Sequence, residues 1–262
     1  MTMAARDRSG RTQVGIAVVF TVVGSWYLGS KYGLINPQLF PTPEQFIAAG
    51  RQLALGEGYA GGLLLQHVLQ SVKLILLGFF AATVIGVPLG LWMGWSRKAE
   101  ALVGPVFLLI RPIPALAWIP LAIVWLGLGD AAKIMILLLA AFVPSVINSF
   151  TGVRNIPQAI IEASQMLGIR GWLLVKEVIV PGALPSIFTG VRLSLQVCLT
   201  ALVAAELLGA PLGLGKILYQ AGLDIYPAMI LAGMVTVAIV GFALTAVFDY
   251  VERLSMPWRT RN

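Results

Sequence analysis

Groups that form covalent cross-links or bind metals are scarce in this sequence. Its 262 residues include one cysteine, Cys198, and one histidine, His67. A single cysteine cannot form an intrachain disulfide or a cysteine metal site. His67 has no carboxylate close in sequence, so we expect a solvated or interfacial side chain rather than a ligand or base. Without a cluster of such groups, a membrane-embedded enzyme is the least favoured function.

Charge is also scarce. Only 11% of the residues are charged and 58% are hydrophobic, and the mean hydropathy is +0.89. Several apolar runs are long enough to cross a hydrocarbon core, which takes about 20 helical residues. The runs are continuous rather than alternating, which favours helices over the strands of a barrel. The sequence therefore predicts an all-α, polytopic membrane protein surrounded by lipid.

We predict a single transmembrane domain over residues 14–252, between cytoplasmic tails at 1–13 and 253–262. Its six spans are expected at residues 14–30, 74–95, 106–128, 131–151, 186–208 and 228–251. A helix over residues 44–55 alternates apolar and polar side chains and is expected to lie along the membrane surface. The basic start and first apolar run could also form a signal peptide, but Trp26 and Tyr27 occupy the place of a small-residue cleavage site.

The distribution of lysine and arginine orients these spans. Residues such as Arg97, Arg154 and Arg253 accumulate on the side of the N-terminus, which is therefore predicted to be cytoplasmic. Both termini and the loop over residues 152–181 then face the cytoplasm. The net charge of +7 is explained by this topology and does not require a nucleic-acid partner.

A polar helix is expected in that loop, from about Pro157 to Trp172. Asn155 is a plausible helix start, a proline is tolerated in the first turn, and Gly168 should end or bend the helix. Small and apolar side chains would let another protein approach closely. An amphipathic helix resting on lipid is the alternative.

The spacing in this loop resembles a known motif. EASQMLG at 162–168, followed by VIVP at 178–181, resembles the cytoplasmic EAA loop of the permease subunits of ABC importers. Ser164 replaces the second alanine of the motif, and Val178 and Val180 replace isoleucine and leucine. In that family the loop forms a coupling helix that binds a nucleotide-binding subunit. The resemblance implies that the coupling residues are Glu162, Ala163, Ser164, Met166, Leu167, Gly168, Ile169 and Pro181.

Other segments extend the resemblance over most of the chain. They are RPIPALAWIPLAIVWLGLGDAAKI at 111–134, PGALPSIFTGVRLSL at 181–195, LVAAELL at 202–208 and GLG at 213–215. They look like permeases of the nitrate, sulfonate and taurine importer group, and closest to taurine and alkanesulfonate permeases. The resemblance implies the type I importer permease fold in a bacterial cytoplasmic (inner) membrane. The implied cargo is a small organic anion, with taurine or another sulfonate ahead of nitrate or bicarbonate.

The resemblance also implies partners. They are a second permease subunit, usually in a homodimer, two ATP-binding cassette subunits and an extracytoplasmic solute-binding protein. This chain has no GxxxxGK[ST] loop, so we expect it to be no enzyme and to hold no cofactor. ATP and magnesium are then expected in the partner ATPases.

Polar residues within apolar spans are candidates for the translocation path, because they are costly to expose to lipid. The candidates are Glu206, Arg111, Arg192, Gln196, Thr200 and Trp118. Glu206 is either a gate or interface residue or a carboxylate near the outer water boundary. Arg111 precedes Pro112 at a broken helix entry and is a hinge, a substrate contact or a group that satisfies free carbonyls. For Arg192 a structural role is favoured. Gln196, Thr200, Ser194 and Asn148 could line a small polar cavity. The alternative is that their side chains form hydrogen bonds that pack the helices.

Two further patterns leave alternatives open. An ion-coupled secondary transporter would need carboxylates deep in the spans, and Glu206 is the one candidate. Four glycines lie on one face of the second span, namely Gly78, Gly86, Gly90 and Gly94. They predict close helix approach, either as static packing or as a surface that slides in a dimer.

Overall fold

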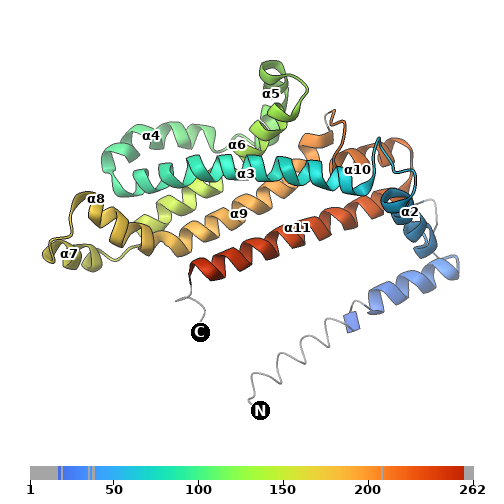
Figure 1. Cartoon of the computed structure of the whole chain (residues 1–262), viewed down its shortest axis with the longest axis horizontal. Coiled ribbons are helices and arrows are strands. Elements are labelled where there is room, and N and C mark those ends of the chain that lie inside the picture. The colour runs from blue at the N-terminus through green and yellow to red at the C-terminus, as the bar shows by residue number, and fades with distance from the viewer. Residues whose placement is uncertain (1–16, 19, 35, 37–38, 208, 257–262) are drawn as a thin grey trace, which may run out of the picture. The chain divides into compact units, whose positions relative to one another are not determined.

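The computed structural model describes residues 17–18, 20–34, 36, 39–207 and 209–256, and its described secondary structure is helical (Figure 1). The predicted tail at 1–13 and the last residues, 257–262, lie outside the described residues. The chain divides into two compact units, each considered by itself. One comprises residues up to Leu64 together with Ile217–Val235, and the other comprises Leu65–Lys216 and residues from Thr236 onward.

The longer elements follow the apolar runs. They are α2 (Pro43–Leu55), α3 (Leu64–Trp95), α4 (Arg97–Ile110), α5 (Ile119–Leu126), α6 (Asp130–Arg154), α9 (Val180–Leu207), α10 (Leu214–Leu223) and α11 (Pro227–Ser255). The shorter elements are a 3₁₀ turn η1 (Ala115–Trp118), α7 (Gln158–Met166), α8 (Gly171–Leu174) and a π-helical turn η2 (Val175–Ile179).

Among the described residues, four helices are long and apolar enough to cross a membrane: α3, α6, α11 and the continuous helix Gly171–Leu207. The pair formed by α4 and Ala115–Leu126 would make a fifth span, but it is bent by 82°. The first predicted span, 14–30, lies partly outside the described residues, and its described residues, 17–18 and 20–30, are helical. The surface helix predicted at 44–55 coincides with α2.

The boundaries of the predicted spans differ from those of the helices, and for two spans the sequence shows the reason. The span predicted at 74–95 belongs to a helix that begins at Leu64, because polar residues before Leu74 are helical as well. The span predicted at 106–128 is not one straight helix. Pro112 and Pro114 lack the amide donors that would continue the ladder, so α4 ends at Ile110 and the chain turns before η1.

The glycine face of α3 packs against α6. A methyl group placed on Gly90 would lie 2.4 Å from the carbonyl oxygen of Val146, and one on Gly78 would lie 2.4 Å from the Cβ of Leu137. Gly86 and Gly94 face α6 in the same way. This glycine face is therefore covered by α6 of the same chain, as the alternative of static packing predicts.

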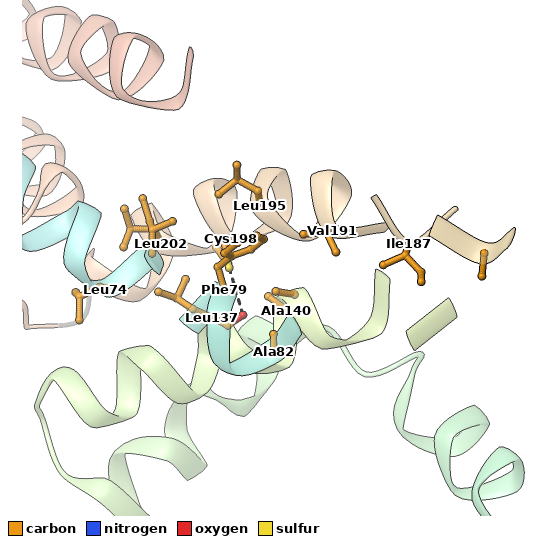
Figure 2. Packing of buried hydrophobic residues seen from close by; sticks show 14 of the residues in the cluster. Leu74, Phe79, Ala82, Leu137, Ala140, Ile187, Val191, Leu195, Cys198 and Leu202 are labelled. Carbon is orange, nitrogen blue, oxygen red and sulfur yellow. Dashed lines mark hydrogen bonds between the residues drawn. The ribbon is translucent and has the colours of Figure 1, made fainter. Parts of the chain in front are cut away.

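Helices α6 and α9 enclose the main hydrophobic core together with α3 (Figure 2). Leu137 of α6 lies beside Cys198 of α9, whose thiol donates to the Leu137 carbonyl at 3.5 Å. Ser194 donates to the carbonyl of Ala141 at 2.7 Å. Cys198 and Ser194 are thus buried packing residues, and for Ser194 the helix-packing alternative is correct.

In the other unit, aromatic side chains connect the first described helix to α2. The Trp26 indole donates to the carbonyl of Pro41 at 2.9 Å and contacts the rings of Phe40 and Phe46 edge-on. A capping box between Thr42 and Gln45 begins α2.

Candidate functional site

The loop that carries the EASQMLG motif is a short helix held between two turns. Helix α6 ends at Arg154, which pairs with Glu100 of α4. Asn155 closes α6, and α7 begins after Pro157. The expectation that Asn155 starts the polar helix is wrong, because α6 extends further than the predicted span and Asn155 serves as its C-cap.

Gly168 ends α7, as the sequence predicts. Its φ of +85° is in the left-handed region that favours glycine. The amide of Gly168 donates to the Gln165 carbonyl at 3.1 Å, and that of Ile169 donates to the Ser164 carbonyl at 3.0 Å. These bonds close the helix end, so the backbone conformation at Gly168 determines the direction in which the chain leaves α7.

The exposed side of this loop is apolar at its tip. Met166 is 87% exposed, Leu167 81% and Trp172 78%. Glu162 and Ala163 lie on α7 beside this tip. An exposed apolar surface of this kind beside polar residues is typical of a site that binds a protein or a membrane.

The inner side of the loop is attached to the core. Ile169 is partly buried against the main hydrophobic core, and Leu174 belongs to it. The Ser164 hydroxyl donates to the carbonyl of Ile160 at 2.7 Å, within α7. Of the predicted coupling residues, Ile169 therefore contacts this chain's own core, whereas Met166 and Leu167 are exposed.

A π-helical turn lies between the loop and α9. It covers Val175–Ile179, and the amide of Val180 donates to the carbonyl of Val175, five residues earlier. Pro181 has no N–H to bond the carbonyl of Glu177, so the regular ladder cannot pass this point. Sequence reasoning missed this turn, although Pro181 is the signal that could have indicated it.

Glu206 lies at the end of α9 and is fully buried. Ser71 of α3 donates to Glu206 Oε1 at 2.6 Å, and the amide of Gly215 donates to Oε2 at 2.7 Å. Leu214 donates its amide to Ser71 at 2.8 Å. Glu206 and Ser71 thus accept the first amides of α10, where a carboxylate is favoured by the helix dipole. Protein groups enclose the carboxylate, and its place near the outer water boundary stays a prediction.

His67 belongs to the same buried cluster. It is fully buried, and the amide of Gly213 donates to its Nδ1 at 2.9 Å. The expectation of a solvated histidine is wrong, because the chain before α10 returns to α3 and covers the ring. Gly213 itself must lack a side chain, since a methyl group there would lie 2.4 Å from the Glu206 carboxyl carbon.

Arg192 connects α9 to α11. Its guanidinium lies 2.8 Å from Asp249 and 2.5 Å from Glu252. This geometry supports the structural role. Gln196 is exposed on the same helix, and Trp118 packs on a separate cluster of buried residues with Ala122, Ala132, Ile136 and Ala205.

Two of the predicted path residues line one cavity. Its volume is about 360 Å³, and its walls come from the turn after α4, from α6 and from α9. Arg111, Pro114, Leu139, Val143, Thr200 and Ala201 are among the lining residues. The cavity therefore brings Arg111 and Thr200 together, but Glu206, Arg192, Gln196 and Trp118 do not line it.

Comparison with known proteins agrees with this architecture. The family of binding-protein-dependent transport system inner membrane components matches residues 86–261. The taurine transport system permease protein TauC of Escherichia coli K12 is 37% identical over 93% of this chain and 87% of its own length. The aliphatic sulfonates transport permease protein SsuC of Bacillus subtilis 168, a relative whose name is marked as provisional, is 30% identical over 98% of this chain and 92% of its own. A chain of the MetNI methionine ABC transporter, solved in inward-facing conformations, superposes with a TM-score of 0.65 at 26% identity, over 73% of this chain and 95% of that one.

Proposed function

Because the chain belongs to the family of binding-protein-dependent transport system inner membrane components, we propose that this ABC importer permease subunit carries a small organic anion. Taurine or another sulfonate comes first, ahead of nitrate and bicarbonate. The observation that carries the proposal is the 37% identity to a taurine permease over 93% of the chain. The direction of transport is into a bacterial cytoplasm, with both termini of the chain on the cytoplasmic side.

The partners follow from the same proposal. Two copies of this chain form the path, two ATP-binding cassette subunits bind ATP and magnesium, and an extracytoplasmic binding protein delivers the solute. The exposed tip of the loop, with Met166, Leu167 and Trp172, is the surface offered to an ATPase. Burial of each large apolar side chain against a partner contributes roughly 1.5–3 kcal/mol of favourable transfer free energy.

Coupling uses the two sides of the loop. Glu162, Ala163, Ser164 and Gly168 shape the contact with the ATPase, while Ile169 and Leu174 connect the loop to the hydrophobic core. A displacement of α7 is then passed through η2 to α9. The π-helical turn before Pro181 is suited to this, since an interrupted ladder bends more easily than a regular one.

The cavity lined by Arg111 and Thr200 is proposed as part of the translocation path. It adjoins α9, the long helix that follows the coupling loop. A shift of α9 would therefore change the wall that carries Thr200 and Ala201. The ion-coupled alternative has less support, because Glu206 already accepts two hydrogen bonds at the start of α10.

Reconstitution tests the proposal. The permease and its ATPase are reconstituted in proteoliposomes together with the binding protein. ATP is supplied on the side of the membrane that carries the ATPase, and the uptake of taurine is measured. We expect uptake that requires all three components and ATP. Uptake by the permease alone, driven by a proton or sodium gradient, would support the ion-coupled alternative.

A further inference from the structure

The turn between α4 and η1 places one arginine at the wall of an apolar cavity. Resting on the function proposed above, we propose that Arg111 binds the sulfonate group of the solute, and so selects an anion within the membrane domain itself.

Two arginines of the long helices have carboxylate partners within the described chain, and Arg111 does not. Arg154 pairs with Glu100, and Arg192 pairs with Asp249 and Glu252. Within the chain that the structure describes, the Arg111 side chain forms no ion pair or hydrogen bond. Arg111 also borders a second cavity, of about 480 Å³, whose acidic residue is Glu100, already paired. The positive charge of Arg111 is therefore available to a ligand.

The surroundings make an anion the fitting ligand. Among the described residues that line the 360 Å³ cavity, Arg111 carries the one charge, and the rest of the wall is mostly apolar. The Arg111 side chain is exposed in the single chain, and a cation beside apolar walls within a membrane is costly unless it is paired. The planar guanidinium also presents several donors in a fork that suits the oxygens of an oxyanion.

The local backbone explains why Arg111 is held there. Its amide still donates to the carbonyl of Phe107, so the residue is the last one attached to α4. Pro112 follows directly and cannot continue the helix. The side chain therefore projects from a helix end with a defined backbone rather than from a free loop.

On the cavity wall formed by α9, Thr200 favours a ligand that also carries a hydrogen-bond donor. Its hydroxyl donates to the carbonyl of Val197 at 2.9 Å, within that helix. With its proton engaged, the oxygen can serve a ligand only as an acceptor. A donor on one wall of the cavity and an acceptor on another match an aminoalkanesulfonate, in which a sulfonate and an ammonium group are joined by a short apolar chain.

Charge restoration tests this assignment. In a Cys198→Ala background, Arg111→Cys is reconstituted with the ATPase and the binding protein, and taurine uptake is measured. We expect a loss of about tenfold or more, the factor expected from one charge-assisted hydrogen bond. Modification with aminoethyl methanethiosulfonate, which adds a positive charge, should restore uptake, whereas the neutral methyl reagent should not. Arg97→Cys, at an arginine of α4 that lines neither cavity, is the matched control and should keep full uptake with either reagent.

Protection separates the solute from a lipid phosphate, which offers similar oxygens. Taurine and ethanesulfonate should slow the modification of the introduced thiol when the Arg111→Cys variant is labelled in the assembled complex. No protection, or equal rescue by the neutral reagent, would overturn the assignment. A lack of taurine uptake by the complex of the unchanged chain would instead contradict the proposed function, and the Arg111 assignment with it.

Discussion

Ser71 of α3 and Glu206 of α9 are 135 residues apart in the sequence and share a 2.6 Å hydrogen bond in the buried interior. Through Leu214 and Gly215, the same two side chains accept the first amides of α10. Three helices thus meet at one carboxylate, which completes a helix start by accepting a donor that would otherwise be buried without a partner.

Replacement of Glu206 by glutamine should weaken the fold. The carboxamide offers one acceptor oxygen and brings an NH₂ group towards two donors, so at least one buried donor loses its partner. We expect a loss of about 1–3 kcal/mol in the free energy of unfolding. Thermal unfolding of the purified protein in detergent measures it. Glu57→Gln, at an exposed acidic residue, is the control, and equal melting temperatures for the two variants would contradict the capping role.

Close packing of α3 on α6 predicts a cost for a single methyl group. In Gly90→Ala the new Cβ would lie 2.4 Å from the backbone oxygen of Val146, and a backbone atom cannot move aside as a side chain can. Overpacking of this kind costs about 1–3 kcal/mol. Gly104→Ala, in α4, meets no atom closer than 4.0 Å and should leave the melting temperature unchanged or raise it. The prediction fails if both variants melt alike.

Gly168→Ala should impair coupling while sparing the spans. The methyl group would meet no atom within 4 Å, so the effect comes from the backbone, whose φ of +85° costs a side-chain-bearing residue about 1–2 kcal/mol. We expect lower taurine uptake with retained assembly, measured as uptake per ATP hydrolysed in proteoliposomes. Gly50→Ala, at an open helical position of α2, is the control. Unchanged coupling in Gly168→Ala would show that the shape of the loop end is not needed.

Pro181→Ala should regularise the π-helical turn. Alanine restores an N–H that can bond the carbonyl of Glu177, so the ladder can pass directly from α8 into α9. We expect equal or higher thermal stability together with lower transport, and slower hydrogen exchange over residues 175–181. Pro185→Ala changes a proline inside α9, beyond the π-helical turn, and serves as the comparison. If both variants transport at the parental rate, η2 is not needed for coupling.

The residues that the sequence located correctly are those with local signals. Gly168 ends α7 because glycine readily adopts the positive φ that closes a helix, which is a property of that one residue. The glycine face of α3 follows from the helical spacing of its glycines. Pro112 indicates a broken helix entry, although the predicted span at 106–128 runs across this residue.

The buried cluster could not be predicted in the same way. His67 meets Gly213 across 146 residues, and nothing near His67 in the sequence indicates that a returning segment covers it. Glu206 was singled out as an unusual carboxylate, but its partners depend on how α3 and the start of α10 pack. Long-range pairing of this kind is a property of the tertiary fold.

The ion pairs of Arg192 have a consequence for motion. The two carboxylates that they use, Asp249 and Glu252, are neighbouring positions on one face of α11. Rotation of α9 about its own axis would carry the guanidinium away from both, whereas a joint shift along their length would keep both contacts. The linkage therefore leaves sliding as the less costly movement, and a displacement of α9 along its axis would be passed to α11 as well.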